Sequence, residues 1–173
     1  MCNQKVALVG PNPEDTMTTT QPRASVDLDA RSVTRTVRVA AGANAVWRAL
    51  SEPEHVAGWF GDGCETDDGG PLAAGTRGRL HFEGYGWFAF EVTRAEPGRV
   101  LAYRWGQSAE EPERMTEATF TLEPDGDGTY LTVHETGFTG DTDDAVRAAL
   151  EGNREGWDGE LDELVEYVES RAW

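Results

Sequence analysis

Apolar and polar residues alternate in a series of short runs along the chain. The runs cover residues 32–41, 77–83, 86–96, 99–105, 115–128 and 129–136. A period of two is typical of β-strands that turn one face to the core and the other to water. Asp-Gly turns between the last two runs predict a tight hairpin. The pattern therefore predicts an antiparallel meander with one wet face.

Two short helices are predicted between the first strand and the meander. Residues 42–50 have a helical pattern, and residues 53–60 form a second piece with Pro53 at a first-turn position. Neither piece is long enough to be stable alone, so both must pack on apolar surface from the rest of the chain. We expect Trp47, Trp59 and Phe60 to close one end of a concave sheet. The glycine-rich, acidic segment 61–78 that follows is expected to form turns.

A long helix is predicted from Asp141 to about Arg171, with Thr142 as its cap. Its apolar stripe, spaced by three and four residues, comprises Val146, Leu150, Asn153, Trp157, Leu161, Leu164 and Val168. Three glycines at 152, 156 and 159 each cost about 1 kcal/mol relative to alanine. They indicate either a close crossing of helix and sheet or a kink, and the pattern leaves both open.

The domain organisation follows from where these patterns begin. Residues 1–32 are rich in Thr, Pro and Asp without a sustained period, which predicts a disordered tail, and Met17 is an alternative start. Residues 33–171 are expected to form a single domain, because the 173-residue chain is long enough to bury a real core.

Charge and cysteine content narrow the function classes. The chain has 15 Lys and Arg against 32 Asp and Glu, a formal net charge of −17. Such a surface repels phosphate backbones and anionic lipids, so we expect no nucleic-acid and no membrane partner. Cys2 and Cys64 are too few for a disulfide scaffold and are expected to be reduced thiols. We predict a cytoplasmic protein.

Four blocks, in order, carry a resemblance to a known family. They are VRVAAGANAVWRALSEPEHVAGWF at 37–60, AEPGRVLAYRW at 95–105, GTYLTVHETGF at 128–138, and a helix with Gly-Trp at 156–157 followed by LDELVEYV. Over about Val33 to Tyr167 the chain resembles the SRPBCC (START-like) superfamily. Within it, the chain resembles the branch named after the C-terminal domain of the activator of the ninety-kilodalton heat-shock chaperone's ATPase.

The resemblance implies an α+β helix-grip fold. In this fold a curved antiparallel sheet is wrapped around a long C-terminal helix, with two short helices after the first strand and a deep cavity between sheet and helix. Superfamily members include ligand carriers, polyketide cyclases, hydroxylase components, antibiotic-resistance proteins and chaperone activators. Function must therefore be argued from the site.

Strand parity and the helix stripe predict what lines such a cavity. The expected ligand-binding residues are Trp59, Phe82, Phe90, Tyr103, Trp105, Phe120, Glu135, Asn153 and Trp157. An apolar, aromatic wall of this kind suits a drug-sized ligand. The alternative is that these rings fill one another's space as an ordinary core.

Glu135 is the most informative of these residues. It shares a face with Leu131 and Val133, so alternation turns its carboxylate inward, where burial tends to raise a carboxyl pKa and favours acid–base chemistry. The alternative is a carboxylate that bonds backbone amides at the Gly137 turn. His55, His81 and His134 lack ligand partners at metal spacing, so we expect no metal and no cofactor.

Three functional hypotheses remain. The first is a protein that binds a hydrophobic or aromatic small molecule, oriented by Glu135, Asn153 and Tyr103. The second is a cyclase- or hydrolase-like enzyme that uses a cavity carboxylate. The third is a regulatory module that binds a chaperone or another protein partner.

Overall fold

A computed structural model describes residues 21–106 and 113–173 of the chain. The strands are β1 (Ser25–Asp27), β2 (Ser32–Val39), β3 (Gly63–Thr66), β4 (Arg77–Phe82), β5 (Gly86–Glu96), β6 (Val100–Gly106), β7 (Met115–Asp125) and β8 (Gly128–Thr136). The helices are α1 (Ala43–Ser51), α2 (Pro53–Val56) and α3 (Asp143–Glu169). Among these residues no helix is both long enough and apolar enough to cross a bilayer.

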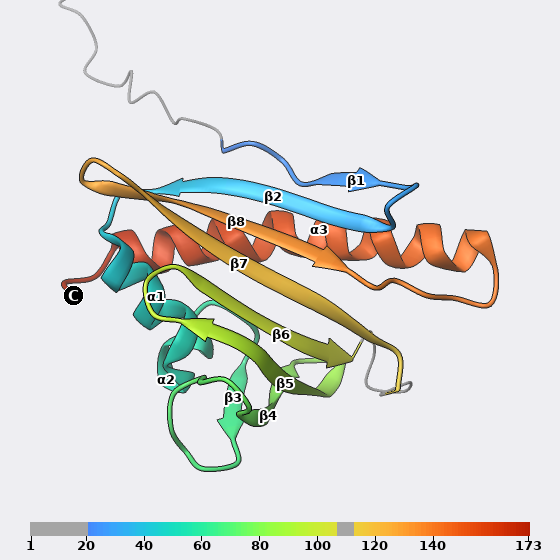
Figure 1. The fold of residues 1–173 in the computed structure, drawn as a ribbon, viewed down its shortest axis with the longest axis horizontal. Coiled ribbons are helices and arrows are strands. Elements are labelled where there is room, and N and C mark those ends of the chain that lie inside the picture. The colour runs from blue at the N-terminus through green and yellow to red at the C-terminus, as the bar shows by residue number, and fades with distance from the viewer. Residues whose placement is uncertain (1–20, 107–112) are drawn as a thin grey trace, which may run out of the picture.

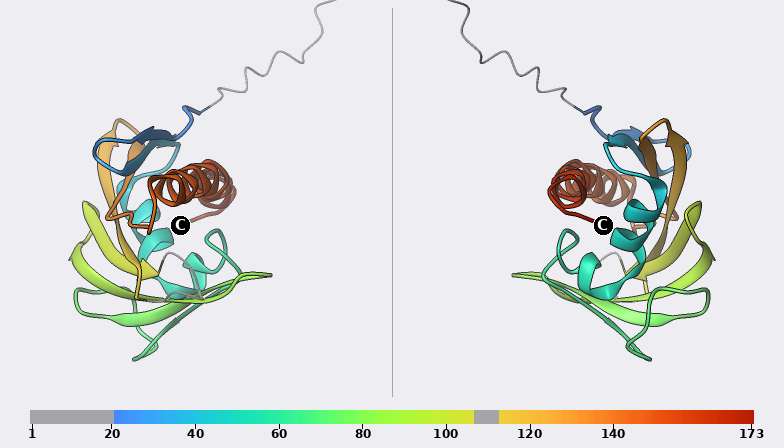
Figure 2. Two further views of the ribbon diagram at one scale, coloured as in Figure 1. Left: turned by 90° about the vertical axis from the view of Figure 1, so that its right-hand side faces the viewer. Right: turned by 90° about the vertical axis from the view of Figure 1, so that its left-hand side faces the viewer.

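The strands form one antiparallel sheet in the order β1-β2-β8-β7-β6-β5-β4-β3. The sheet bends, and α3 lies along its concave side, as the two end-on views in Figure 2 show. The long strands β7 and β8 form the predicted hairpin, in which Asp125 pairs with Gly128 (Figure 1). The α+β helix-grip fold expected from the sequence is therefore confirmed.

Helix α3 packs against the sheet through the apolar stripe predicted from the sequence. Thr142 caps the helix, accepting a 3.1 Å hydrogen bond from the amide of Ala145. The stripe residues, with Asn153 half-buried, lie against the sheet, and the fully buried members are Val146, Leu150, Trp157, Leu161, Leu164 and Val168. Packing of this face, rather than intrinsic propensity, stabilises a helix that contains three glycines.

A buried arginine fixes α3 against β2. Arg35 is 2% exposed and donates hydrogen bonds of 2.9 and 2.6 Å to the carbonyls of Trp157 and Asp158. Its guanidinium also forms ion pairs with the carboxylates of Asp158 and Asp162. The amide of Ala24 donates a 2.7 Å hydrogen bond to Asp158, so the segment before β1 joins the same network.

Helices α1 and α2 close one end of the concavity, as expected. Pro53 lies at the first helical position of α2. The indole of Trp59 is 2% exposed and donates a 2.9 Å hydrogen bond to the carbonyl of Ala49, which ties the segment after α2 back to α1. Phe60 stacks on Trp59 with a centroid distance of 5.0 Å and reaches the space between sheet and helix.

The fold includes two short strands that the pattern did not predict. Within the segment expected to be a tail, Ser25–Asp27 pairs with β2 and Ala24 is buried, so residue 32 is not the boundary of the fold. Within the segment expected to form turns, Gly63–Thr66 is a strand that pairs with β4. Both strands are short edge strands that lack an alternating pattern. The alternative start at Met17 lies outside the described residues.

The glycines of α3 do not mark a close crossing of helix and sheet. A Cβ at residue 152, 156 or 159 would meet nothing within 4 Å, so no close crossing requires glycine. The helix also runs unbroken through all three positions. Instead, Gly152 and Gly156 border a pocket.

Candidate functional site

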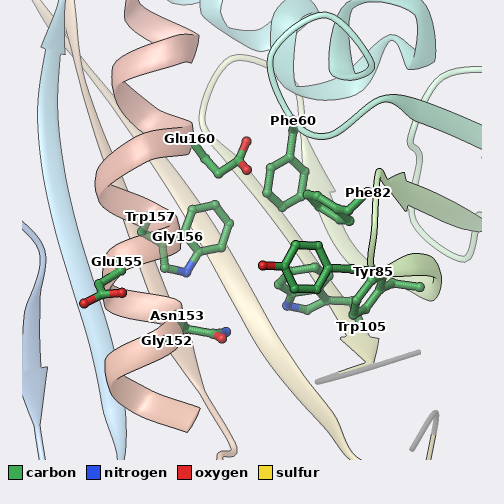
Figure 3. A pocket seen from close by; sticks show the side chains of 11 residues that line it. Phe60, Phe82, Tyr85, Trp105, Gly152, Asn153, Glu155, Gly156, Trp157 and Glu160 are labelled. Atoms are coloured by element: carbon green, nitrogen blue, oxygen red, sulfur yellow. The ribbon is translucent and has the colours of Figure 1, made fainter. Parts of the chain in front are cut away.

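A pocket of about 500 Å³ lies between the β4–β6 part of the sheet and α3. Its lining comprises Phe60, Phe82, Tyr85, Phe88, Trp105, Gly152, Asn153, Glu155, Gly156, Trp157 and Glu160. Figure 3 shows the α3 residues on one side and the rings from the sheet and the α2–β3 segment on the other. This is the size range of cavities that hold drug-sized molecules.

Aromatic rings make up most of the wall and support one another. Phe60 stacks on Trp157 with a centroid distance of 5.4 Å and an interplanar angle of 12°. The same ring meets Phe82 edge-on at 5.2 Å, and Phe82 meets Phe88 edge-on at 5.4 Å. Because the rings of Phe82, Phe88 and Trp105 are only partly buried, they present apolar surface to whatever enters the pocket.

Glu135 lies behind this wall and organises it. Its side chain is fully buried and accepts four hydrogen bonds from uncharged donors. Trp105 Nε1 and Thr116 Oγ1 donate to Oε1 at 2.8 and 2.5 Å. Asn153 Nδ2 and Trp157 Nε1 donate to Oε2 at 2.8 and 2.7 Å.

The network decides between the alternatives for Glu135. Its carboxylate does turn inward, but it bonds side chains of β6, β7 and α3 rather than the backbone amides at Gly137. Three of its four donors line the pocket, whereas Glu135 itself does not. A carboxylate can accept about four hydrogen bonds. The four donors therefore satisfy Glu135 fully and offset the cost of burying its carboxylate.

Glu160 is the carboxylate that does line the pocket. It lies one turn after Trp157, and Figure 3 shows it reaching from α3 toward Phe60. Its Oε2 is buried without a hydrogen-bond partner. Burial, with repulsion from Glu163 and Asp62 in support and the Gly61 amide opposing, raises the pKa of Glu160 to about 7.

The structure separates the predicted site residues into two groups. Phe82, Trp105, Asn153 and Trp157 line the pocket. The second group does not line it and consists of Trp59, Phe90, Tyr103, Phe120 and Glu135. These five side chains are buried.

Tyr103 illustrates the second group. Its ring packs against Phe90 and Phe120 with centroid distances of 5.8 and 5.7 Å. Burial, with the charge of Glu135 in support, raises the pKa of its phenol well above the usual value. Around Tyr103 the rings thus fill one another's space, which is the core alternative.

Some lining residues were not among the predicted ligand-binding residues. Tyr85 lies in the turn between β4 and β5, where no strand pattern applies. Glu160 follows Asn153 by seven residues and Trp157 by three. This is helical spacing on one face, and it was the signal that could have placed Glu160 beside the pocket.

In residues 21–106 and 113–173 the other titratable groups give no second site as well defined as this one. Among the described residues, Glu52, Glu54 and His55 bring ligand atoms within 4.8 Å of one another. Arg48, however, donates to both oxygens of Glu52 at 2.9 and 3.2 Å, and Glu54 is exposed. Burial raises the pKa of the Cys64 thiol to about 11, which makes it a poor nucleophile.

Comparison with known families identifies the fold family. The model of a family described as activator of Hsp90 ATPase homolog 1-like protein matches residues 40–169. The chain belongs to this family. Its membership confirms the resemblance inferred from the four sequence blocks. A search of curated proteins gives no match.

Solved structures of similar proteins agree with the family. DynU16, a protein in the dynemicin biosynthetic locus, has a TM-score of 0.67 and 26% identity over 81% of this chain, which spans 48% of DynU16. MLL2253 from Mesorhizobium loti has a TM-score of 0.67 and 25% identity, covering 81% of this chain and 99% of that one. CalU16 from Micromonospora echinospora has a TM-score of 0.63 and 25% identity, covering 79% and 75%.

Proposed function

We propose that the protein binds a hydrophobic or aromatic small molecule in the pocket between β4–β6 and α3. The observation that carries this proposal is a pocket of about 500 Å³ whose wall is mostly aromatic. Drug-sized ligands are usually held this way, with apolar walls for affinity and a small number of polar groups for orientation. Similarity to DynU16, from a biosynthetic locus, is in keeping with a small-molecule ligand.

The wall is held in place before a ligand arrives, which supports binding. Glu135 fixes the indoles of Trp105 and Trp157 and the amide of Asn153 by hydrogen bonds of 2.7–2.8 Å. A site organised in advance loses less conformational entropy when it binds, so more of the contact energy appears as affinity.

The glycines of α3 provide a direct test. A Cβ at Gly156 would meet no atom within 4 Å, and Gly156 borders the pocket, whereas Gly159 does not. We expect Gly156→Leu to weaken binding of a neutral apolar dye such as Nile red at least about tenfold, and Gly159→Leu to bind as the natural protein does. Equal dye binding by both variants would contradict the proposal.

A second candidate function is general acid–base catalysis on the bound molecule, by a cyclase- or hydrolase-like enzyme. The observation that favours it is Glu160, whose pKa is raised to about 7 inside an apolar pocket. A carboxyl group with a pKa near neutrality can both accept and donate a proton at working pH. The role that the sequence suggested for Glu135 thus passes to Glu160.

Proton exchange tests this candidate without knowledge of the natural substrate. We expect the protein to accelerate deuterium exchange next to the carbonyl of a neutral aromatic ketone, with a half-maximal rate near the pKa of Glu160. Glu160→Gln should abolish the acceleration and leave dye binding in place. Equal exchange rates for the two proteins would exclude this role of Glu160.

A chaperone or other protein partner is the third hypothesis. It rests on the family's name and on the net charge of −17. Association driven by this charge is expected to weaken as salt screens it. Pull-downs at low and at high ionic strength measure that dependence.

A further inference from the structure

We propose that the ligand of this pocket carries a protonated amine or a similar cationic nitrogen, and that Glu160 is the group that pairs with it. The inference rests on the proposed binding function and specifies the ligand class. It follows from the hydrogen-bonding groups, the charges and the rings that the pocket presents.

The first argument is the balance of donors and acceptors at the wall. The indole N–H groups of Trp105 and Trp157 and the side-chain N–H₂ of Asn153 all donate to Glu135, on the far side of the wall. An indole has no second donor, so neither tryptophan offers one to the pocket. Glu160, in contrast, has a buried Oε2 without a partner. Apart from the Tyr85 hydroxyl and the second N–H of Asn153, the polar side chains of the described wall therefore present acceptors, which suits a ligand that donates.

The second argument is charge. None of the eleven lining residues is Lys, Arg or His, whereas two of them, Glu155 and Glu160, are acidic. Asp62 and Glu163 add negative charge near Glu160, and the Gly61 amide and the phenol of Tyr103 are the other polar groups that interact with it. A cleft lined by one sign of charge attracts ligands of the opposite sign.

A cation of the protein does not take this role among the described residues. Arg154 is the arginine of α3 in this region, and it pairs with Glu151 and Asp158 at 2.6 and 3.0 Å. Because those carboxylates already hold its guanidinium, it does not neutralise Glu160. The pocket carboxylate remains available to a ligand.

The third argument is the aromatic wall. The π-faces of tryptophan, tyrosine and phenylalanine attract cations within about 6 Å of the ring centre, and the attraction grows when water is excluded. Phe60 and Trp157 stack beside Glu160, and Tyr85 extends from the β4–β5 turn with its hydroxyl toward α3 (Figure 3). An ammonium group attached to an apolar body would meet both rings and carboxylate.

The pairing has a defined pH dependence. Glu160 has a pKa of about 7, so it is largely protonated below neutrality and ionised above it. A primary amine stays protonated at about pH 8, as lysine does. Affinity for the amine should therefore rise between about pH 6 and pH 8, whereas affinity for a neutral analogue should not.

Three probes with one apolar body test the proposal by calorimetry on the full chain. Naphthylethylamine, naphthylethanol and naphthylacetic acid differ in charge and share the ring system. At about pH 8 we expect the amine to bind about tenfold tighter than the alcohol, and the acid to bind weakest. Glu160→Gln, which keeps the shape of the side chain, should remove the preference for the amine. Glu123→Gln, a matched loss of charge at an exposed position outside the pocket lining, should retain it.

The outcomes separate this inference from the binding function itself. Equal binding of amine and alcohol, or a preference that survives Glu160→Gln, overturns the cationic ligand and leaves an apolar binding pocket. Absence of binding by all three probes, together with loss of dye binding in the natural protein, overturns both.

Discussion

The indole nitrogen of Trp157 donates a 2.7 Å hydrogen bond to Oε2 of Glu135, so the middle of α3 is tied to the last strand of the sheet. Both residues are almost completely buried, at 2% and 0% exposure. The bond fixes the ring that forms the α3 side of the pocket. Fold stability and the shape of the site therefore depend on the same contact.

Removing the Glu135 carboxylate should be severely destabilising. Glu135→Ala leaves the two indole N–H groups, an amide and a hydroxyl without their acceptor, and each unpaired buried donor costs about 1–3 kcal/mol. We expect a loss of at least about 4 kcal/mol in the free energy of unfolding, measured by urea titration.

Glu135→Gln is the informative companion variant. Its amide keeps one oxygen but places N–H₂ against either Trp105 or Trp157, which can only donate. We expect a smaller loss, of about 2 kcal/mol. A variant as stable as the natural protein would show that the carboxylate is not held as described.

Replacement of Arg35 should be as destabilising as replacement of Glu135. Its guanidinium is buried among Asp158, Asp162 and the α3 carbonyls. Arg35→Ala would leave the mostly buried Asp158 carboxylate without this partner, and should lower the free energy of unfolding by about 3–5 kcal/mol. Arg38 on the same strand is the control, because its pairs with Asp125 and Asp127 are exposed to solvent. Arg38→Ala should cost less than about 1 kcal/mol by the same denaturation assay. Similar losses of stability for the two variants would contradict the role of Arg35 in fixing α3 against β2.

Glu160 should make stability fall as pH rises. Its folded-state pKa of about 7 lies above the ordinary 4.5, so between these values the folded protein binds more protons than the unfolded chain. The resulting loss accumulates from about pH 4.5 through pH 7 and is complete above it. Glu160→Gln should therefore be more stable than the natural protein by about 3 kcal/mol at pH 8, and nearly equal to it at pH 4. A difference independent of pH would refute the assignment.

Alanine at the α3 glycines should stabilise the protein. A Cβ at Gly156 or Gly159 meets no neighbour, so each Gly→Ala change should raise the free energy of unfolding by up to about 1 kcal/mol. The two variants should differ in ligand binding, since only Gly156 borders the pocket. Thermal melts with and without the dye measure both effects. Destabilisation by either alanine would mean that the helix packs more closely there than described.

Much of the fold could be predicted because most strands of the sheet alternate between apolar and polar residues. The period of two located β4 to β8 and turned Glu135 inward with Leu131 and Val133. The three- and four-residue spacing placed Asn153 and Trp157 on the inner face of α3. These inferences need only local pattern, and the long strands and long helix supply enough of it.

The rest depends on register and curvature, which local pattern does not contain. Thr116 meets Glu135 because β7 pairs with β8 in one register, and Trp105 follows through the pairing of β6 with β7. The pocket lies beside Phe82, Phe88 and Trp105, whereas Phe90, Tyr103 and Phe120 are part of the core. Parity alone treats all of these positions alike.

The four-donor arrangement around Glu135 also sets when the molecule can act. Its members come from β6, β7, β8 and α3, so the back wall does not exist in a partly folded chain that lacks the final helix. Such an intermediate would expose the apolar face of the sheet and would have no formed binding site. A small molecule that fits the pocket would thus bind only the completed fold and would stabilise it by mass action.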